Sequence, residues 1–231
     1  MISSLLKRVA AILPSSTQHE LRRVYFAREI KRRRFFTDEA EFALLPELLV
    51  PGDWALDVGA NVGHYSMRMA ELAGADGRVI ALEPVPDTFA LLAANVRMSP
   101  HANISVLNVA ASDRTACVGM QIPNFSEGLP NYYQAKLTTN PAALRIVTIP
   151  IDSLGLPRIK LVKIDVEGHE LPVLLGMRNL LQRDHPVLIV ETGSDETTNF
   201  VSALGYSIQR LPGSSNILGM PHRDGMPSFR A

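Results

Sequence analysis

Short apolar runs recur along the chain from about residue 54, each separated from the next by a stretch of different periodicity. The runs are continuously apolar and not alternating, so they predict strands that are covered on both faces. A sixth run, Tyr206 to Leu211, is weaker than the others. The five clear runs are Trp54 to Val58, Arg78 to Leu82, Ile104 to Val109, Ile159 to Val166 and Val187 to Val190.

Helical periodicity lies between these runs. Apolar side chains repeat at helical spacing over residues 89–96 and 171–175. A further helix is expected over residues 38–49, because Pro51 and Gly52 follow it and are typical of a helix end. This alternation predicts an α/β fold with a doubly wound, mostly parallel sheet.

Two regions break the alternation. Residues 119–144 are rich in Pro, Asn, Gly and Tyr, and residues 212–231 are rich in Gly, Pro and Ser. Over residues 119–148 we expect either a loop on the substrate side or a β-arm that packs its tyrosines on the core. For residues 221–231 we expect a flexible tail.

Composition limits the class of protein. A 231-residue chain that is 46% hydrophobic and 20% charged suits one globular domain, here residues 36–220. The single cysteine, Cys117, allows no internal disulfide, which fits a reducing compartment and leads us to expect a cytoplasmic protein. No apolar run reaches the roughly 20 residues of a membrane span.

The formal net charge is zero, but positive charge is concentrated at the start. Residues 1–35 contain nine Lys and Arg against Glu20 and Glu29, which predicts a basic, helical N-terminal extension. Such a segment can contact nucleic acid, an anionic membrane surface or an acidic substrate, or it can simply be solvated. Because the remainder is net acidic, we expect no nucleic-acid partner. The sequence leaves a homo-oligomer open.

The sharpest local motif follows the first predicted strand and runs from Asp57 to Tyr65. It contains Gly59 and Gly63, which allow a tight turn and close approach to a ligand, and it leads into a helix. A dinucleotide site requires G-x-G-x-x-G, and this loop has G-x-x-x-G preceded by Asp57. A carboxylate here repels a pyrophosphate and suits a cationic, phosphate-free nucleoside such as S-adenosylmethionine (SAM).

Acidic residues also end the later strands. Glu83 lies 26 residues after Asp57 and is a candidate acceptor for the hydroxyls of a ribose. After the third strand, small residues over 108–113 leave room for an adenine ring, although a plain turn explains them equally well. The fourth strand leads into Asp165, Glu167 and His169, a cluster of ionisable groups typical of functional clefts. Lys163 is expected to pair with Asp165.

Together these motifs resemble the FkbM family of SAM-dependent methyltransferases. The resemblance rests on residues 57–63, Glu83-Pro84, 151–154, 163–170 and 187–191, and it spans about residues 36 to 220. It implies a Rossmann-like, mostly parallel seven-stranded sheet of the class I methyltransferase type. It also implies SAM as cofactor and O-methylation of a hydroxyl on a sugar, glycan or polyketide-type acceptor. The residues expected to bind SAM are Asp57, Gly59, Ala60, Asn61, Gly63, Tyr65, Glu83, Pro84, Asn108, Ala110, Ser112 and Asp165.

The chemistry expected of such an enzyme is in-line methyl transfer assisted by a general base. His169 is the leading candidate base because imidazole titrates near pH ~6.5, with Asp165 and Glu167 as alternatives. Asp165 and Glu191 are also candidate ligands for Mg²⁺, although Thr192 follows where a further ligand is needed. Two other classes remain open: a SAM-binding module without turnover, and a methyltransferase for a nitrogen or nucleic-acid acceptor.

Overall fold

The computed structural model describes residues 11–222 apart from residues 127, 141 and 142. A central sheet is built from β1 (Trp54–Val58), β2 (Arg78–Leu82), β3 (Ile104–Leu107), β8 (Leu161–Ile164), β9 (Val187–Glu191), β10 (Tyr206–Arg210) and β11 (Asn216–Pro221). Their order is β10-β11-β9-β8-β1-β2-β3. The five strands from β9 to β3 pair in parallel, and β11 runs antiparallel to both neighbours. The predicted mostly parallel seven-stranded sheet is confirmed.

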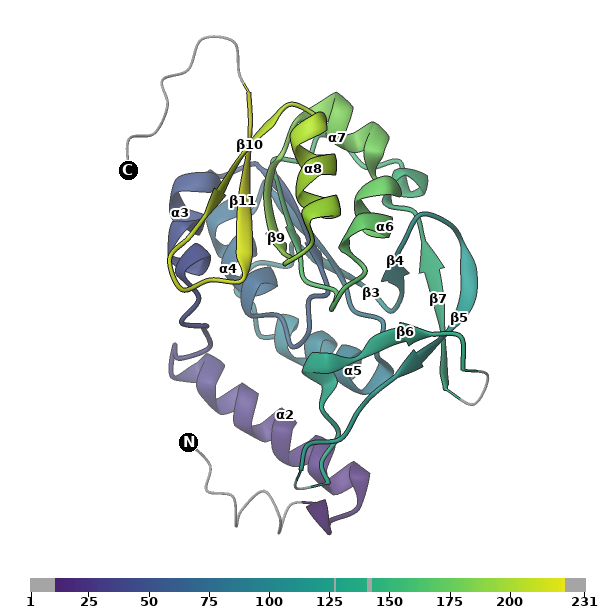
Figure 1. The fold of residues 1–231 in the computed structure, drawn as a ribbon. Helices are drawn as coiled ribbons and strands as arrows, with labels where there is room; N and C mark the ends of the chain where they lie inside the picture. The colour runs from purple at the N-terminus through teal and green to yellow at the C-terminus, as the bar shows by residue number, and fades with distance from the viewer. Residues whose placement is uncertain (1–10, 127, 141–142, 223–231) are drawn as a thin grey trace.

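Helices cover both faces of this sheet (Figure 1), which is why its central strands are mostly apolar. Leu56 and Val58 pack in one core cluster with side chains of α6, α7 and α8. Ala55, one residue out of phase, faces Met69 of α4 in a second cluster on the opposite face. The helices are α3 (Leu45–Leu48), α4 (His64–Ala73), α5 (Pro86–Val96), α6 (Glu170–Leu175), α7 (Arg178–Asp184) and α8 (Asp195–Ala203).

A second, smaller sheet occupies the region that lacks a clear period in sequence. It contains β4 (Ala110–Ala111), β5 (Ala116–Gln121), β6 (Lys136–Thr138) and β7 (Leu144–Ile149), in the order β4-β7-β5-β6. Between β5 and β6 the chain runs through a short 3-10 helix, Tyr132–Gln134. Met120 and Ile146 of this sheet pack on Val85 and Ala110. The small sheet is thereby anchored beside the carboxyl ends of β2 and β3.

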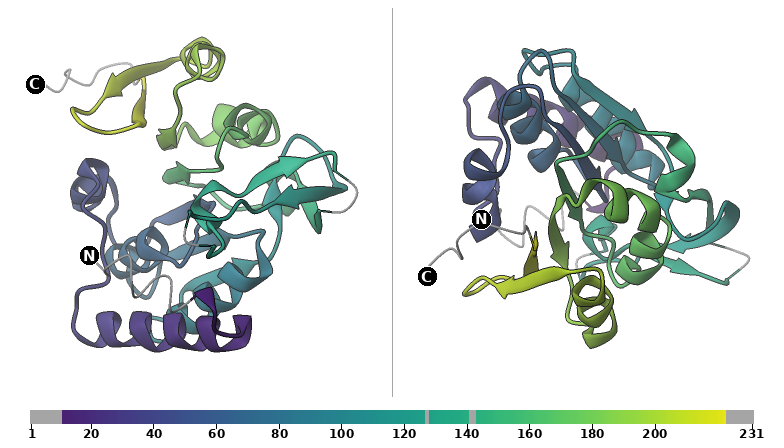
Figure 2. Two further views of the ribbon diagram at one scale, coloured as in Figure 1. Left: turned by 60° about the horizontal axis from the view of Figure 1, so that its bottom comes forward. Right: turned by 90° about the horizontal axis from the view of Figure 1, so that it is seen from above.

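The N-terminal segment forms a helix, α2 (Ser15–Lys31), that packs on α5 through Phe26 (Figures 1 and 2). The expected helix over residues 38–49 is interrupted. A 3-10 helix spans Ala40–Leu44, and α3 begins only at Leu45. Pro46 explains the interruption, because it has no N–H to donate to a carbonyl four residues earlier. A continuous α-helix therefore cannot run through it.

The C-terminal region contains a strand where the sequence indicated none. β11 lies within the expected irregular stretch 212–231 and inserts between β10 and β9. Gly219 lies where an added Cβ would be 3.2 Å from Leu188 Cβ, so a residue that looks like a strand breaker in fact permits close packing. The expected flexible tail lies outside the described residues except for positions 221 and 222, as do residues 1–10 of the basic extension. Within the described range, no helix is long and apolar enough to cross a membrane.

Candidate functional site

The loop after β1 is held against the loop after β8. Gly59 has φ +83°, and an added Cβ there would lie 1.8 Å from the backbone oxygen of Asp165. Gly63, at φ +97°, is the N-cap residue that precedes α4. Only glycine satisfies both the left-handed backbone and the close contact at position 59. The glycine motif therefore brings the ends of two neighbouring strands together.

Glu83, at the end of β2, binds this loop. Its Oε2 accepts a hydrogen bond from Asn61 N and its Oε1 accepts one from Val85 N, both at 2.9 Å. Burial raises the pKa of the Glu83 carboxyl to about 7. Asn61 is itself left-handed, with φ +49°. Its Oδ1 is buried and has no hydrogen-bond partner in the described part of the chain, so this oxygen is available to a ligand.

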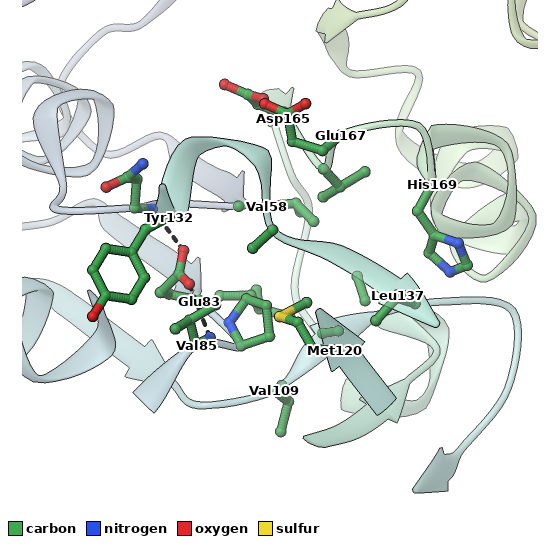
Figure 3. Close-up of a pocket in the computed structure, with 18 of the residues that line it drawn as sticks. Val58, Glu83, Val85, Val109, Met120, Tyr132, Leu137, Asp165, Glu167 and His169 are labelled. Atoms are coloured by element: carbon green, nitrogen blue, oxygen red, sulfur yellow. Dashed lines mark hydrogen bonds between the residues drawn. The ribbon is translucent and has the colours of Figure 1, made fainter. Parts of the chain in front are cut away.

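A hollow of about 710 Å³, including the part open to solvent, lies at the carboxyl ends of the parallel strands (Figure 3). Glu83 and Tyr132 lie on one side of it, and Asp165, Glu167 and His169 lie across from them. Its lining residues are Val58, Gly59, Asn61, Leu82, Glu83, Pro84, Val85, Val109, Ala110, Ala111, Met120, Tyr132, Tyr133, Ala135, Leu137, Asp165, Val166, Glu167 and His169.

His169 is oriented by a hydrogen-bonded chain. Its Nε2 lies 2.9 Å from Ser112 Oγ, and the Ser112 hydroxyl donates to Asp113 Oδ1 at 3.2 Å. A Ser112 hydroxyl that donates to Asp113 accepts from Nε2, and in that tautomer of His169 Nδ1 is unprotonated. Burial lowers the pKa of the His169 imidazole. The ring is thus neutral near pH 7.

Asp165 belongs to a second group of polar side chains that interact with one another. Lys163 is almost fully buried in β8, and its Nζ lies 3.4 Å from Asp165 Oδ2, so the expected ion pair is present. The same Nζ donates a hydrogen bond to Asn216 Oδ1 at 3.1 Å. The carboxyl of Glu191 also lies within hydrogen-bonding reach of the Asp165 carboxyl. Burial raises the pKa of Asp165 to about 7, whereas the hydrogen bond with Asp165 lowers that of Glu191.

Some of the expected site residues line the hollow, and others lie outside its lining. All three expected catalytic residues line the hollow, as do six of the expected cofactor residues: Gly59, Asn61, Glu83, Pro84, Ala110 and Asp165. Within the described chain, the other six are not among its lining residues: Asp57, Ala60, Gly63, Tyr65, Asn108 and Ser112.

Three of the residues outside the lining make hydrogen bonds with other parts of the protein. Asp57 is buried and accepts a hydrogen bond from the Ser66 hydroxyl, while burial raises its pKa to about 6. The Tyr65 hydroxyl donates to Glu39 at 2.7 Å, on the opposite face of the sheet. Asn108 donates to the backbone oxygens of Glu83 and Pro84. Asn108 therefore holds the backbone at the end of β2, beside the hollow.

The candidate metal ligands are divided between two hollows. Glu191 lines a neighbouring one, which shares Glu167 with the first. Among the described residues no three His, Cys, Asp or Glu side chains are grouped as a metal would require. The described residues therefore give the candidate Mg²⁺ site no support.

Sequence reasoning missed the apolar wall. Val85, Met120 and Leu137 line the hollow, and two of them come from the small sheet whose strands the sequence does not reveal. Tyr132 and Tyr133, which the loop composition pointed to, do line it. The Tyr132 hydroxyl donates to Asp87 at 2.9 Å, and the Arg22 guanidinium lies 4.8 Å from the centre of its ring.

A mostly parallel, doubly wound sheet with one reversed strand and a hollow at its carboxyl edge places the chain among the Rossmann-like folds. Comparison with known proteins identifies the particular group. The sequence model of the methyltransferase FkbM domain matches residues 57–209, and the chain belongs to this family. It is therefore a methyltransferase, and the resemblance seen in the sequence is confirmed.

Two related sequences and one solved structure are similar to this chain. Hexuronic acid methyltransferase AglP of Haloferax volcanii is 32% identical over 174 residues, which is 72% of this chain and 68% of AglP. AMB antimetabolite synthetase AmbE of Pseudomonas aeruginosa is 27% identical over 56% of this chain but only 8% of its own length. The crystal structure of methyltransferase FkbM from Methylobacillus flagellatus KT matches with a TM-score of 0.56 at 20% identity, over 73% of this chain and 43% of that chain. The present chain thus spans less than half of that solved protein. At 20% identity, the match supports the fold alone.

Proposed function

We propose that this protein transfers a methyl group from SAM to a hydroxyl of a sugar or glycan. The observation that carries the proposal is that one hollow joins the Asn61–Glu83 wall to Asp165, Glu167 and His169 across from it. The name of the relative AglP, a hexuronic acid methyltransferase, supports a sugar acceptor.

The residues of the hollow fit SAM. Glu83 is placed to accept hydrogen bonds from ribose hydroxyls with its remaining lone pairs, and the unpartnered Asn61 Oδ1 accepts a further donor. The apolar side chains of Val85, Met120 and Leu137 suit the faces of an adenine ring. The Gly59 loop and Asp165 would contact the amino-acid end of SAM. SAM supplies a methyl group that its sulfonium centre already activates.

The remaining task of the protein is to align the acceptor and remove its proton. His169 Nδ1 accepts the proton of the attacking hydroxyl, because Nε2 is committed to Ser112. Asp165 and Glu167 face the same space and are the alternative bases. Tyr132 and Tyr133 offer ring faces on which a sugar can stack. No step requires a metal ion.

Isothermal titration with SAM tests the cofactor assignment. Glu83→Gln keeps the shape of the side chain and removes its charge, so SAM is expected to bind about 10- to 100-fold more weakly, the equivalent of one charged hydrogen bond. Glu47→Gln, an exposed residue of α3, is the control and should bind normally. A folded protein that gives no heat with SAM contradicts the proposal.

A screen of sugars, uronic acids and glycans with methyl-labelled SAM tests the reaction. Transfer of label to a sugar hydroxyl is expected. Normal SAM binding without label transfer to any acceptor would identify a SAM-binding module, and transfer to nitrogen or nucleic acid would overturn the acceptor class.

A further inference from the structure

Helix α2 carries apolar side chains on two sides, and only one of them packs on the rest of the described chain. Phe26 is buried against Val62 and Leu91. On the other side Leu21, Val24 and Tyr25 are 54%, 53% and 53% exposed. An isolated exposed apolar residue is ordinary, but three at spacings of three and four form a continuous patch.

This patch continues into a cationic one on the same face. An α-helix turns about 100° per residue, so the exposed side chains fall within roughly one third of its circumference. We call this surface the outer face of α2. Its members are Leu21, Val24, Tyr25, Arg28, Lys31 and Arg32, all exposed.

The charge of this region is one-sided. Arg33 and Arg34 follow the helix and are exposed as well. Of the two acids of α2, Glu20, four residues before Val24, lies at the margin of the outer face and is paired with Arg23, and Glu29 is only partly exposed. The outer face thus presents apolar groups followed by cations, and the carboxylate at its margin, Glu20, is paired with Arg23.

We propose that the outer face of α2 docks on the surface of an anionic lipid bilayer. Leu21, Val24 and Tyr25 would enter the boundary between headgroups and acyl chains. Arg28, Lys31 and Arg32 would meet the lipid phosphates, each contributing about 1 kcal/mol, or a factor of about five in affinity. This proposal rests on the surface alone and holds whichever acceptor the enzyme methylates.

Other occupants fit the outer face less well. A nucleic acid would engage the cations and leave the apolar side chains in water. A second copy of the chain would offer the same positive face and therefore no complementary charge. A lipid surface satisfies both halves of the patch at once.

Co-sedimentation of the full chain with vesicles tests the proposal. Binding is expected with vesicles of phosphatidylcholine mixed with phosphatidylglycerol, weakening as salt is raised, and not with phosphatidylcholine alone. The variant R28Q/K31Q/R32Q should bind on the order of a hundredfold more weakly, from the factor of about five per cation. The variant L21S/V24S/Y25S should also lose binding, even at low salt. Circular dichroism shows whether each variant is folded.

Matched controls come from a distant surface. Arg178→Gln and Leu175→Ser change an exposed cation and an exposed leucine near the α6–α7 junction and should leave vesicle binding intact. The proposal is overturned if neither vesicle type binds, or if the controls lose as much binding as the α2 variants. It is equally overturned if the chain binds RNA but no vesicles, or if sedimentation velocity shows a dimer that L21S/V24S/Y25S converts to monomer.

Discussion

At the scale of single residues, His169 combines a free ring nitrogen with a fixed orientation. Ser112 and Asp113 hold Nε2, and burial keeps the ring neutral. The sequence pointed to His169 as a base and to Ser112 as an adenine contact. The geometry instead associates Ser112 with the histidine, a link between residues 57 positions apart that no local motif reveals.

Replacing His169 with Gln should separate catalysis from cofactor binding. We expect kcat to fall by about 10²- to 10⁴-fold, the usual contribution of a general base, with SAM affinity unchanged. In the unaltered enzyme kcat/KM should rise with pH through a value below 6.5 and then level off, because burial lowers the pKa of His169 and only the neutral ring accepts a proton. Initial rates across pH measure both. An unchanged pH profile in the variant would assign the base to Asp165 or Glu167.

At the scale of elements, the contact between the loops after β1 and β8 depends on Gly59. Gly59→Ala should destabilise the protein by about 3 kcal/mol or more, because a Cβ adds a backbone collision with Asp165 to the cost of a left-handed alanine. Gly52 is the matched control. It has φ +92° with nothing within 4 Å of an added Cβ, so Gly52→Ala should cost only about 1–2 kcal/mol. Urea unfolding measures the difference, and equal losses would show that the contact does not matter.

Elements with a pronounced period or motif were predictable, and those defined by long-range contacts were not. The strands of the parallel sheet are buried on both faces and are therefore readable as apolar runs. β11 contains Gly219 and ends at Pro221, and its place is fixed by β9 and β10 and not by its own composition. The small sheet was hidden for the same reason, and with it Met120 and Leu137 of the hollow. Asp165, Glu167 and His169 were found because their ionisable groups follow a strand closely.

At the scale of the whole molecule, one buried polar network joins three distant parts of the chain. Asn216 of β11 donates to Glu41 in the N-terminal segment and accepts from Lys163 in the centre of the sheet. Lys163 in turn pairs with Asp165 at the hollow and lies 5.3 Å from the centre of the Tyr65 ring. Removing one partner from such a network leaves buried polar groups without compensation.

Lys163→Met should therefore lower the free energy of unfolding by about 3–5 kcal/mol, although methionine fits the space. Lys160→Met, three residues earlier in the chain and only partly buried, should change it by less than about 0.5 kcal/mol. Denaturant titration followed by tryptophan fluorescence, from Trp54, provides the measurement. A loss no larger than that of the control would mean that the cation contributes nothing to the folded state.

The insertion of β11 has a consequence for the order in which the molecule is completed during synthesis. β9 and β10 lie on either side of β11 and have no direct pairing with each other in the described sheet. Until residue 221 has left the ribosome, both therefore present a bare edge, and an edge of that kind recruits other chains. The nascent protein is expected to be most prone to aggregate shortly before its sheet closes, and a chaperone that masks β9 would act in that interval.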